Sequence, residues 1–161
     1  MGKGTKAVMT NALRIVAAEG IQHEILTYQT DDGALDGVSV AAKIDIPPEH
    51  VFKTLVTRGN DKQIYVFVVP VAETLNLKSA AQAVGAKRIE MVHVSEITPL
   101  TGYVKGGCSP IGMKKQYPTF FDVSCLGLDK IVVSAGKIGV QLVIEPKALL
   151  KLIKAETVAL T

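Results

Sequence analysis

Four segments of the chain carry apolar residues at helical spacing or begin with helix-capping residues. Residues 11–19 place their apolar side chains on one face, and Gly20 follows as a stop signal. "DGVSVAAK" and "NLKSAAQAV" begin at Asp36 and Asn76, which are typical N-caps. "PKALLKLIKA" begins with Pro146, a residue favoured in the first helical turn. The pattern therefore predicts four helices.

β-Branched and aromatic runs between these helices predict strands. "HEILTYQT" is one such run, and "RIEMVHV" is another. "VFKTLVT" and "QIYVFVVP" flank Gly59, Asn60 and Asp61, a composition typical of a hairpin turn, so these two strands are predicted to pair antiparallel. "PTFFDVS" and the two apolar runs of "KIVVSAGKIGVQLVIE" predict three further strands.

The order of these elements decides the predicted fold class. Helices and strands do not alternate strictly, which favours an α+β fold over a doubly wound one. We expect a mixed or antiparallel, barrel-like sheet with flanking helices. The 161 residues suit one domain, and no repeat, low-complexity tract or linker divides them. Residues 1–161 are therefore predicted to form a single domain.

Composition and charge narrow the class of protein. Hydrophobic residues make up 48% of the chain, which is typical of a globular protein and not of a disordered one. The net charge of +3 permits an anionic partner without indicating a protein that coats DNA. No apolar stretch approaches the roughly 20 residues of a membrane span. The two cysteines lie outside any Cys-rich framework, which favours reduced thiols. We expect a cytoplasmic protein that binds neither membranes nor DNA.

Lys53 is the charged residue with the most unusual predicted position. In a strand, the period of two puts Lys53 on one face with Val51 and Leu55, among apolar neighbours. One interpretation is a lysine that snorkels or protects a sheet edge. The other is a cation that points into a pocket and holds a phosphate or a carbonyl group.

Glycine is concentrated in two other segments. In "GGCSPIG", from Gly106 to Gly112, adjacent glycines allow the backbone to approach a ligand and to direct N–H groups at an anion or an oxyanion. "SAGKIG", which begins at Ser134, lies between two predicted strands and matches neither the P-loop nor the dinucleotide fingerprint. Ordinary turns explain both segments as well.

The sequence offers no conventional catalytic or metal-binding motif. Cys108 lies in the first glycine-rich segment, but no histidine is near it in sequence, so a cysteine nucleophile is disfavoured. His23, His50 and His93 lack metal-binding spacing, and no G-x-S-x-G elbow is present. We expect neither a metal nor another cofactor.

Three motifs, in order and spacing, resemble the YbaK/EbsC family: "VFKTLV" around Lys53, "GGCSPIGMKK" from Gly106 and "SAGKIG" from Ser134. The similarity continues through "LTY" at Tyr28, "VVPVAETLNLKSAAQAVGAKRIEM" and "TGYVKGG", so it covers nearly the whole chain. Members of the family are freestanding relatives of the editing domain inserted in bacterial prolyl-tRNA synthetases. The resemblance implies a compact α+β fold with a mixed, barrel-like sheet and a substrate crevice.

The resemblance also implies an activity, partners and site residues. The expected activity is hydrolysis of the ester between an amino acid and the 3′ end of a tRNA, with cysteine on the tRNA for proline as the expected substrate. The expected partners are the tRNA acceptor end and prolyl-tRNA synthetase. By position, the resemblance implies catalytic roles for Lys53, Gly106 and Gly107. It implies substrate-binding roles for Tyr28, Thr54, Ser109, Pro110, Ser134, Gly136 and Gln141.

The mechanism implied by the resemblance needs no nucleophile from the enzyme, because the thiol of the substrate attacks its own carbonyl group. Two positions depart from the family pattern. Gln141 stands where several relatives have an aspartate, and "QTDDGALDG" after Tyr28 lacks an aromatic residue that some relatives have. These departures leave the amino acid of the substrate open, with alanine as one alternative. A non-catalytic tRNA- or nucleotide-binding module is a second alternative.

Overall fold

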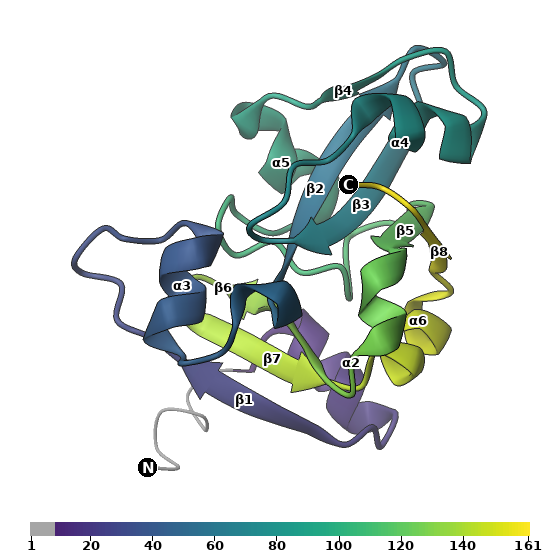
Figure 1. Cartoon of the computed structure of the whole chain (residues 1–161). Coiled ribbons are helices and arrows are strands. Elements are labelled where there is room, and N and C mark those ends of the chain that lie inside the picture. Colours follow the sequence, from purple (N-terminus) through teal and green to yellow (C-terminus); the bar gives the residue numbers. More distant parts are fainter. Residues whose placement is uncertain (1–8) are drawn as a thin grey trace.

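The computed structural model describes residues 9–161, which form one α+β domain (Figure 1). The helices are α2 (Asn11–Ala18), α3 (Gly37–Lys43), α4 (Leu77–Val84), α5 (Val94–Thr101) and α6 (Pro146–Ile153), with short 3₁₀ helices η1 (Pro48–His50) and η2 (Val123–Gly127). The strands are β1 (His23–Thr27), β2 (Phe52–Gly59), β3 (Ile64–Pro70), β4 (Ile89–Met91), β5 (Thr119–Asp122), β6 (Ile131–Lys137), β7 (Val140–Ile144) and β8 (Glu156–Val158). All four predicted helices are present, and the predicted α+β class is confirmed.

Local capping explains where the predicted helices begin and end. The Asp36 carboxylate accepts a hydrogen bond from the Ser39 N–H at 3.2 Å and so caps α3. The Asn76 side chain accepts from the Ser79 N–H at 3.1 Å and caps α4 in the same way. Gly85 ends α4 in the left-handed conformation, with φ of 73°. These are short-range interactions, and the sequence alone was sufficient to predict them.

The strands form two sheets that meet near the start of β2. One sheet has the order β1-β7-β6 and is antiparallel throughout. The other has the order β4-β2-β3-β5-β8, in which β3, β5 and β8 run parallel to one another while β4, β2 and β3 are antiparallel. A parallel bridge between Val51 and Val132 joins the two sheets. Figure 1 shows β2 reaching from the upper sheet toward β6, with α3 beside this junction. The prediction of a mixed sheet is therefore confirmed.

Side-chain alternation along β3 divides the core. Val66 and Val68 pack into a cluster shared with the other sheet, α2 and α6. Phe67 and Val69 pack on the opposite face, against α4. The Phe67 and Phe120 rings stack with their centroids 5.6 Å apart. With both faces covered, β3 is buried almost along its whole length, and it gives β2 a rigid backing.

Two elements differ from the prediction. The β-prone run "RIEMVHV" forms a strand only as far as Met91, and α5 begins at Val94. Sequence reasoning missed α5 because Pro99 lies inside it, where proline ordinarily disfavours a helix. The Glu96 carboxylate stabilises its first turn by accepting from the His93 N–H at 3.1 Å. The short strand β8 was also missed, because three residues carry almost no periodicity. No helix within residues 9–161 has the length and apolar character needed to cross a membrane.

Candidate functional site

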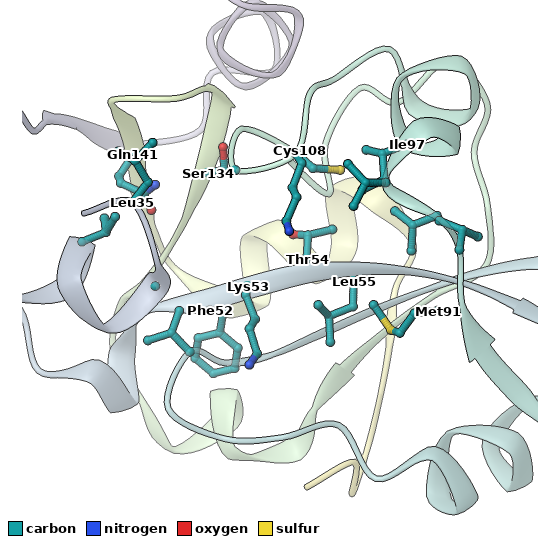
Figure 2. A pocket seen from close by; sticks show the side chains of 18 of the residues that line it. Leu35, Phe52, Lys53, Thr54, Leu55, Met91, Ile97, Cys108, Ser134 and Gln141 are labelled. Carbon is teal, nitrogen blue, oxygen red and sulfur yellow. The ribbon is translucent and has the colours of Figure 1, made fainter. Parts of the chain in front are cut away.

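A cavity of about 400 Å³ is lined by residues from both sheets, α3, α5 and the loop between α5 and β5 (Figure 2). This volume lies in the usual range for small-molecule sites. The lining is mostly apolar and has few polar groups, as such sites usually do. The ten labelled side chains in Figure 2 are Leu35, Phe52, Lys53, Thr54, Leu55, Met91, Ile97, Cys108, Ser134 and Gln141.

The cavity brings together six of the ten predicted site residues, although they are distant in sequence. They come from the end of β1, from β2, from the α5–β5 loop and from β6 and β7. These six residues are Tyr28, Lys53, Thr54, Gly106, Ser134 and Gln141. The other four, Gly107, Ser109, Pro110 and Gly136, are not among the residues that line the cavity.

An open strand edge forms one wall of the cavity. β3 pairs with β2 from Phe52 to Arg58, but on the other side β4 pairs only with Thr57 to Gly59. The first half of β2 therefore has a free edge, and side chains from both of its faces reach the cavity. Figure 2 shows Lys53 and Leu55 on one side of the strand and Thr54 on the side that faces Ser134 and Cys108.

The surroundings of Lys53 match the predicted strand alternation. Lys53 pairs with Val69 and shares a face with Leu55 and with the core residues that pack against α4. Partial burial lowers the pKa of its ammonium group, and the nearby Glu73 carboxylate opposes this shift. A half-buried cation without a close ion-pair partner favours an anionic or electron-rich ligand.

Thr54 carries the one buried side-chain polar atom in the described part of the chain that has no hydrogen-bond partner. Its hydroxyl group lies at the cavity wall, on the side of Ser134 and Cys108. An unpaired buried hydroxyl ordinarily destabilises a protein by about 1 to 3 kcal/mol. Native proteins rarely leave such groups unpaired, so an unsatisfied one at a cavity wall indicates a ligand that completes the bond.

The loop of residues 102–118 forms the opposite wall and is fixed by one hydrogen bond within the loop and by another to α2. The buried Tyr103 hydroxyl donates to the Ile111 carbonyl at 2.6 Å. Burial raises the pKa of Tyr103 to about 12, so the group is a neutral donor at physiological pH. The Asn11 side-chain amide donates to the Gly112 carbonyl at 2.7 Å and ties the loop to α2.

The two adjacent glycines of this loop have different surroundings. Gly106 is exposed at the cavity with φ of 87°, a conformation that favours glycine. Its N–H and that of Cys108 donate no hydrogen bond to a described residue. The Gly107 N–H, in contrast, donates to the Val104 carbonyl at 3.0 Å. The expectation that Gly107 directs its N–H at a substrate therefore does not fit the structure, since that donor is already paired.

Gly107 instead allows the two glycine-rich segments to touch. A Cβ atom at Gly107 would lie 2.8 Å from the backbone nitrogen of Ile138 in the β6–β7 turn. Gly136, in the second glycine-rich segment, also permits a close contact with the loop. Its φ is 101°, and a Cβ atom there would lie 2.8 Å from the Tyr103 ring. Both glycines permit close packing behind the cavity wall.

Ser109 and Pro110 also differ from the expected substrate-binding role. Both are buried, and the Ser109 hydroxyl accepts a hydrogen bond from the Ile111 N–H at 3.2 Å. This bond stabilises a tight turn and leaves Ser109 no exposed surface for a ligand. The two residues brace the loop that carries Gly106.

The far end of the cavity carries hydrogen-bonding groups. Gln141 is buried in the sheet and its side chain bonds to no described residue. The Ser134 hydroxyl accepts from the Gly136 N–H at 3.1 Å and keeps its own proton available. Lys43, from α3, lies 5.8 Å from the centre of the Tyr28 ring and holds that residue's segment in place.

Sequence reasoning missed the second lysine and the apolar end of the cavity. Lys105 lines the cavity and is exposed. Met91, Val94 and Ile97 form the end nearest α5, and the first two are 48% and 59% exposed. The position of Lys105 next to Gly106 was an available signal, whereas the apolar end depends on α5, which was not predicted.

Cys108 lines the cavity but does not have the properties of a nucleophile. Burial raises the pKa of its thiol to about 11, so the thiolate fraction at pH 7 is on the order of one in ten thousand. Figure 2 shows its sulfur near Ile97, in apolar surroundings. Cys125 is buried elsewhere, and both thiols are free. Among residues 9–161, no cluster of three His, Cys, Asp or Glu side chains is arranged to hold a metal ion.

Comparisons with known proteins identify the family of this chain. The sequence matches the family described as "Aminoacyl-tRNA editing domain" over residues 33–152. A relative from Enterococcus faecalis (strain ATCC 700802 / V583) is 38% identical over 161 residues, which cover 100% of this chain and 98% of that protein. It is named "Putative Cys-tRNA(Pro)/Cys-tRNA(Cys) deacylase EbsC".

Solved structures share the fold at lower identity. The crystal structure of "a putative trans-editing enzyme for prolyl tRNA synthetase" has a TM-score of 0.81 at 23% identity, over 96% of this chain and 98% of that chain. A hypothetical protein has a TM-score of 0.85 at 22% identity, over 94% and 99% of the two chains. At these identities the structures support the fold alone. From the matched family and the full-length relative together, it follows that the chain belongs to the YbaK/EbsC family of aminoacyl-tRNA editing domains, which are aminoacyl-tRNA deacylases.

Proposed function

We propose that this chain acts in trans as a deacylase of tRNA for proline that carries cysteine by mistake. The observation that carries the proposal is the chemistry of the cavity. It holds two lysines, an unpaired threonine hydroxyl and two unpaired backbone N–H groups, but no activated nucleophile. Such a site can orient an ester and stabilise charge that develops on its carbonyl oxygen. It is suited to a substrate that supplies its own nucleophile.

The cysteine thiol of the substrate is that nucleophile. Its sulfur forms a bond to the carbonyl carbon of the ester, and the bond from that carbon to the ribose oxygen breaks. The thiol proton ends on the ribose oxygen, which leaves as the free hydroxyl group of the tRNA. Water then opens the resulting thiolactone and releases cysteine. The enzyme contributes by holding the thiol and the carbonyl group in a reactive geometry.

Stabilisation of the oxyanion is assigned to the loop side of the cavity. The N–H groups of Gly106 and Cys108 have no partner within the described chain, and the Thr54 hydroxyl lies on the same side of β2 as Cys108. One well-placed donor of this kind contributes on the order of 10²- to 10³-fold in rate. Lys53 approaches from the other side of β2, and its flexible stem can reach the carbonyl region.

A panel of mischarged tRNAs tests activity and substrate together. We expect the purified chain to release cysteine from tRNA for proline, and to release serine from the same tRNA far more slowly, because serine lacks the thiol. Release of serine at an undiminished rate would indicate an activated water and overturn the thiol mechanism. Faster release of alanine would assign the enzyme to another amino acid. Binding without any turnover would support a non-catalytic module instead.

Lys53→Ala tests the assignment of the lysine. We expect release to fall by about 10²-fold or more while the circular dichroism spectrum and melting temperature remain near those of the wild type. Full activity in this variant would remove Lys53 from the catalytic residues. Lys87→Ala is a matched control, since Lys87 is an exposed lysine outside the cavity.

A synthetase partner is also part of the proposal. The chain has a net charge of only +3, so its own electrostatic attraction for tRNA is modest. Selection of the correct tRNA by prolyl-tRNA synthetase would compensate for this weak attraction. Addition of that synthetase is expected to increase the rate on mischarged tRNA for proline and to leave the rate on a cysteinyl ester of AMP unchanged.

A further inference from the structure

The charged side chains that line the cavity are all positive. Lys53 and Lys105 are its only charged lining residues in the described part of the chain, and no aspartate or glutamate lines it. Two like charges around a mostly apolar space produce a positive potential that attracts an anion. An aminoacyl ester alone does not match this potential, because its amino group is a cation and its carbonyl group is neutral.

The two lysines lie at different depths. Lys53 is half-buried and projects from the side of β2 opposite Ser134 and Cys108. Lys105 is exposed and directly precedes Gly106, whose N–H is unpaired. Lys105 forms no ion pair or hydrogen bond with a described residue. It is therefore an exposed, uncompensated cation that lines the cavity and directly precedes the proposed oxyanion site.

The terminal nucleotide of an aminoacyl-tRNA has one anionic group, the phosphate at its 5′ position. The rest of the tRNA continues from this phosphate, so the phosphate must lie toward solvent while the ester enters the cavity. We propose that Lys105 binds this phosphate and thereby sets the depth at which the ester stops beside Gly106. This inference rests on the proposed function. It assigns the phosphate to Lys105 and leaves Lys53 to the ester.

Lysine is suited to this role because its ammonium group is a compact charge on a flexible stem. The contact is exposed to solvent, so its effect is moderate: removing it is expected to lower kcat/KM about 3- to 10-fold. For a single-stranded tRNA end, loss of one phosphate contact also lowers the slope of log K against log salt by about 0.7.

The test compares two small substrates that differ only in the phosphate, the cysteinyl ester of AMP and the cysteinyl ester of adenosine. We expect the wild type to prefer the AMP ester and Lys105→Ala to lose this preference, with the adenosine ester hydrolysed at the wild-type rate. Lys105→Arg should keep the preference, and Lys87→Ala should behave as the wild type. A second measurement needs no catalysis: AMP should bind more tightly than adenosine to the wild type but not to Lys105→Ala.

The outcomes separate this inference from the proposed function. If the wild type releases cysteine neither from mischarged tRNA nor from the two esters, but its preference for AMP binding depends on Lys105, the proposed function fails and the phosphate site stands. If the wild type hydrolyses both esters and Lys105→Ala slows them equally, the phosphate assignment is overturned. If Lys53→Ala loses the preference for the AMP ester and Lys105→Ala keeps it, the phosphate site would be assigned to Lys53 instead.

Discussion

Neighbouring residues of β2 have separate roles because a strand sends successive side chains to opposite faces. Lys53 projects toward the side of the sheet that packs against α4, while Thr54 faces the glycine-rich loop. Both line the cavity at the edge of β2 that β4 leaves open along the first half of the strand. The sequence predicted the alternation, but only the structure identified Thr54 as the residue with an unsatisfied group.

Replacing Thr54 by valine is expected to affect activity and stability in opposite directions. The isosteric change removes a buried hydroxyl that bonds to nothing, so the free energy of unfolding should stay the same or rise by about 1 kcal/mol. Deacylation should fall by about 10-fold or more, because a donor to the ester is lost. Chemical denaturation and kinetics on a mischarged tRNA measure the two effects.

Thr57→Val is the matched control for this pair of measurements. The Thr57 hydroxyl is fully buried on the same strand and donates to the Tyr65 carbonyl at 2.8 Å. Its removal should lower the free energy of unfolding by about 1 to 2 kcal/mol and leave deacylation unchanged. A Thr54→Val protein that is less stable and fully active would show that Thr54 is structural.

At the scale of elements, the two glycine-rich segments act as one unit. The loop of residues 102–118 carries Gly106, and the β6–β7 turn supports it through the contact of Gly107 with Ile138. The glycines of the two segments do not all have the same role. Gly107 allows close approach to the backbone of Ile138, and Gly136 allows close approach to the Tyr103 ring. Gly106, in contrast, lines the cavity, and its N–H has no partner among the described residues.

Gly107→Ala tests this packing contact. The added Cβ atom would lie 2.8 Å from a backbone nitrogen, which cannot move as freely as a side chain. We expect the free energy of unfolding to fall by about 1 to 3 kcal/mol, and deacylation to fall because Gly106 and Cys108 are displaced. Calorimetry and kinetics provide the measurements.

Gly127→Ala provides the comparison, since a Cβ atom at Gly127 would meet no atom within 4 Å. This variant should keep the wild-type melting temperature and activity. Equal behaviour of the two alanine variants would contradict the close contact between the loop and the β6–β7 turn.

At the scale of the whole molecule, burial of thiols couples stability to alkaline pH. Burial raises the pKa of Cys108 and of Cys125 to about 11, above the value of an unfolded chain. The folded state thus disfavours the thiolate and holds the thiol proton more tightly than the unfolded chain does. The buried protonated thiols therefore contribute fully to the free energy of unfolding below the unfolded pKa, and this contribution is lost as the pH rises through about 9 to 11.

We expect the free energy of unfolding to decline over that interval, by up to about 1.4 kcal/mol per pH unit for each fully buried thiol. The two thiols should contribute similarly, because burial raises their pKa values to the same level. Urea unfolding at pH 8, 9.5 and 10.5 measures the decline. The double variant Cys108→Ala and Cys125→Ala should show a shallower decline, and an unchanged pH profile would contradict the assignment.

Short-range information accounts for what the sequence determined by itself. Caps at Asp36 and Asn76 and the hairpin of β2 and β3 depend on residues close together in the chain. The order of the three family motifs can likewise be read from the sequence without the structure. These features were sufficient to predict the α+β class, four helices and the family. Six of the ten expected site residues also line the cavity.

The tertiary structure decided which groups remain available to a ligand. Whether an N–H or a hydroxyl is free depends on partners that are distant in sequence or on the conformation of a folded loop. Gly107, which is paired, and Thr54, which has no partner among residues 9–161, show this. The α5 helix, the open edge of β2 and the position of Lys105 at the cavity likewise arise from packing between segments. Hydrogen-bond saturation and burial are properties of the folded chain, and local sequence does not specify them.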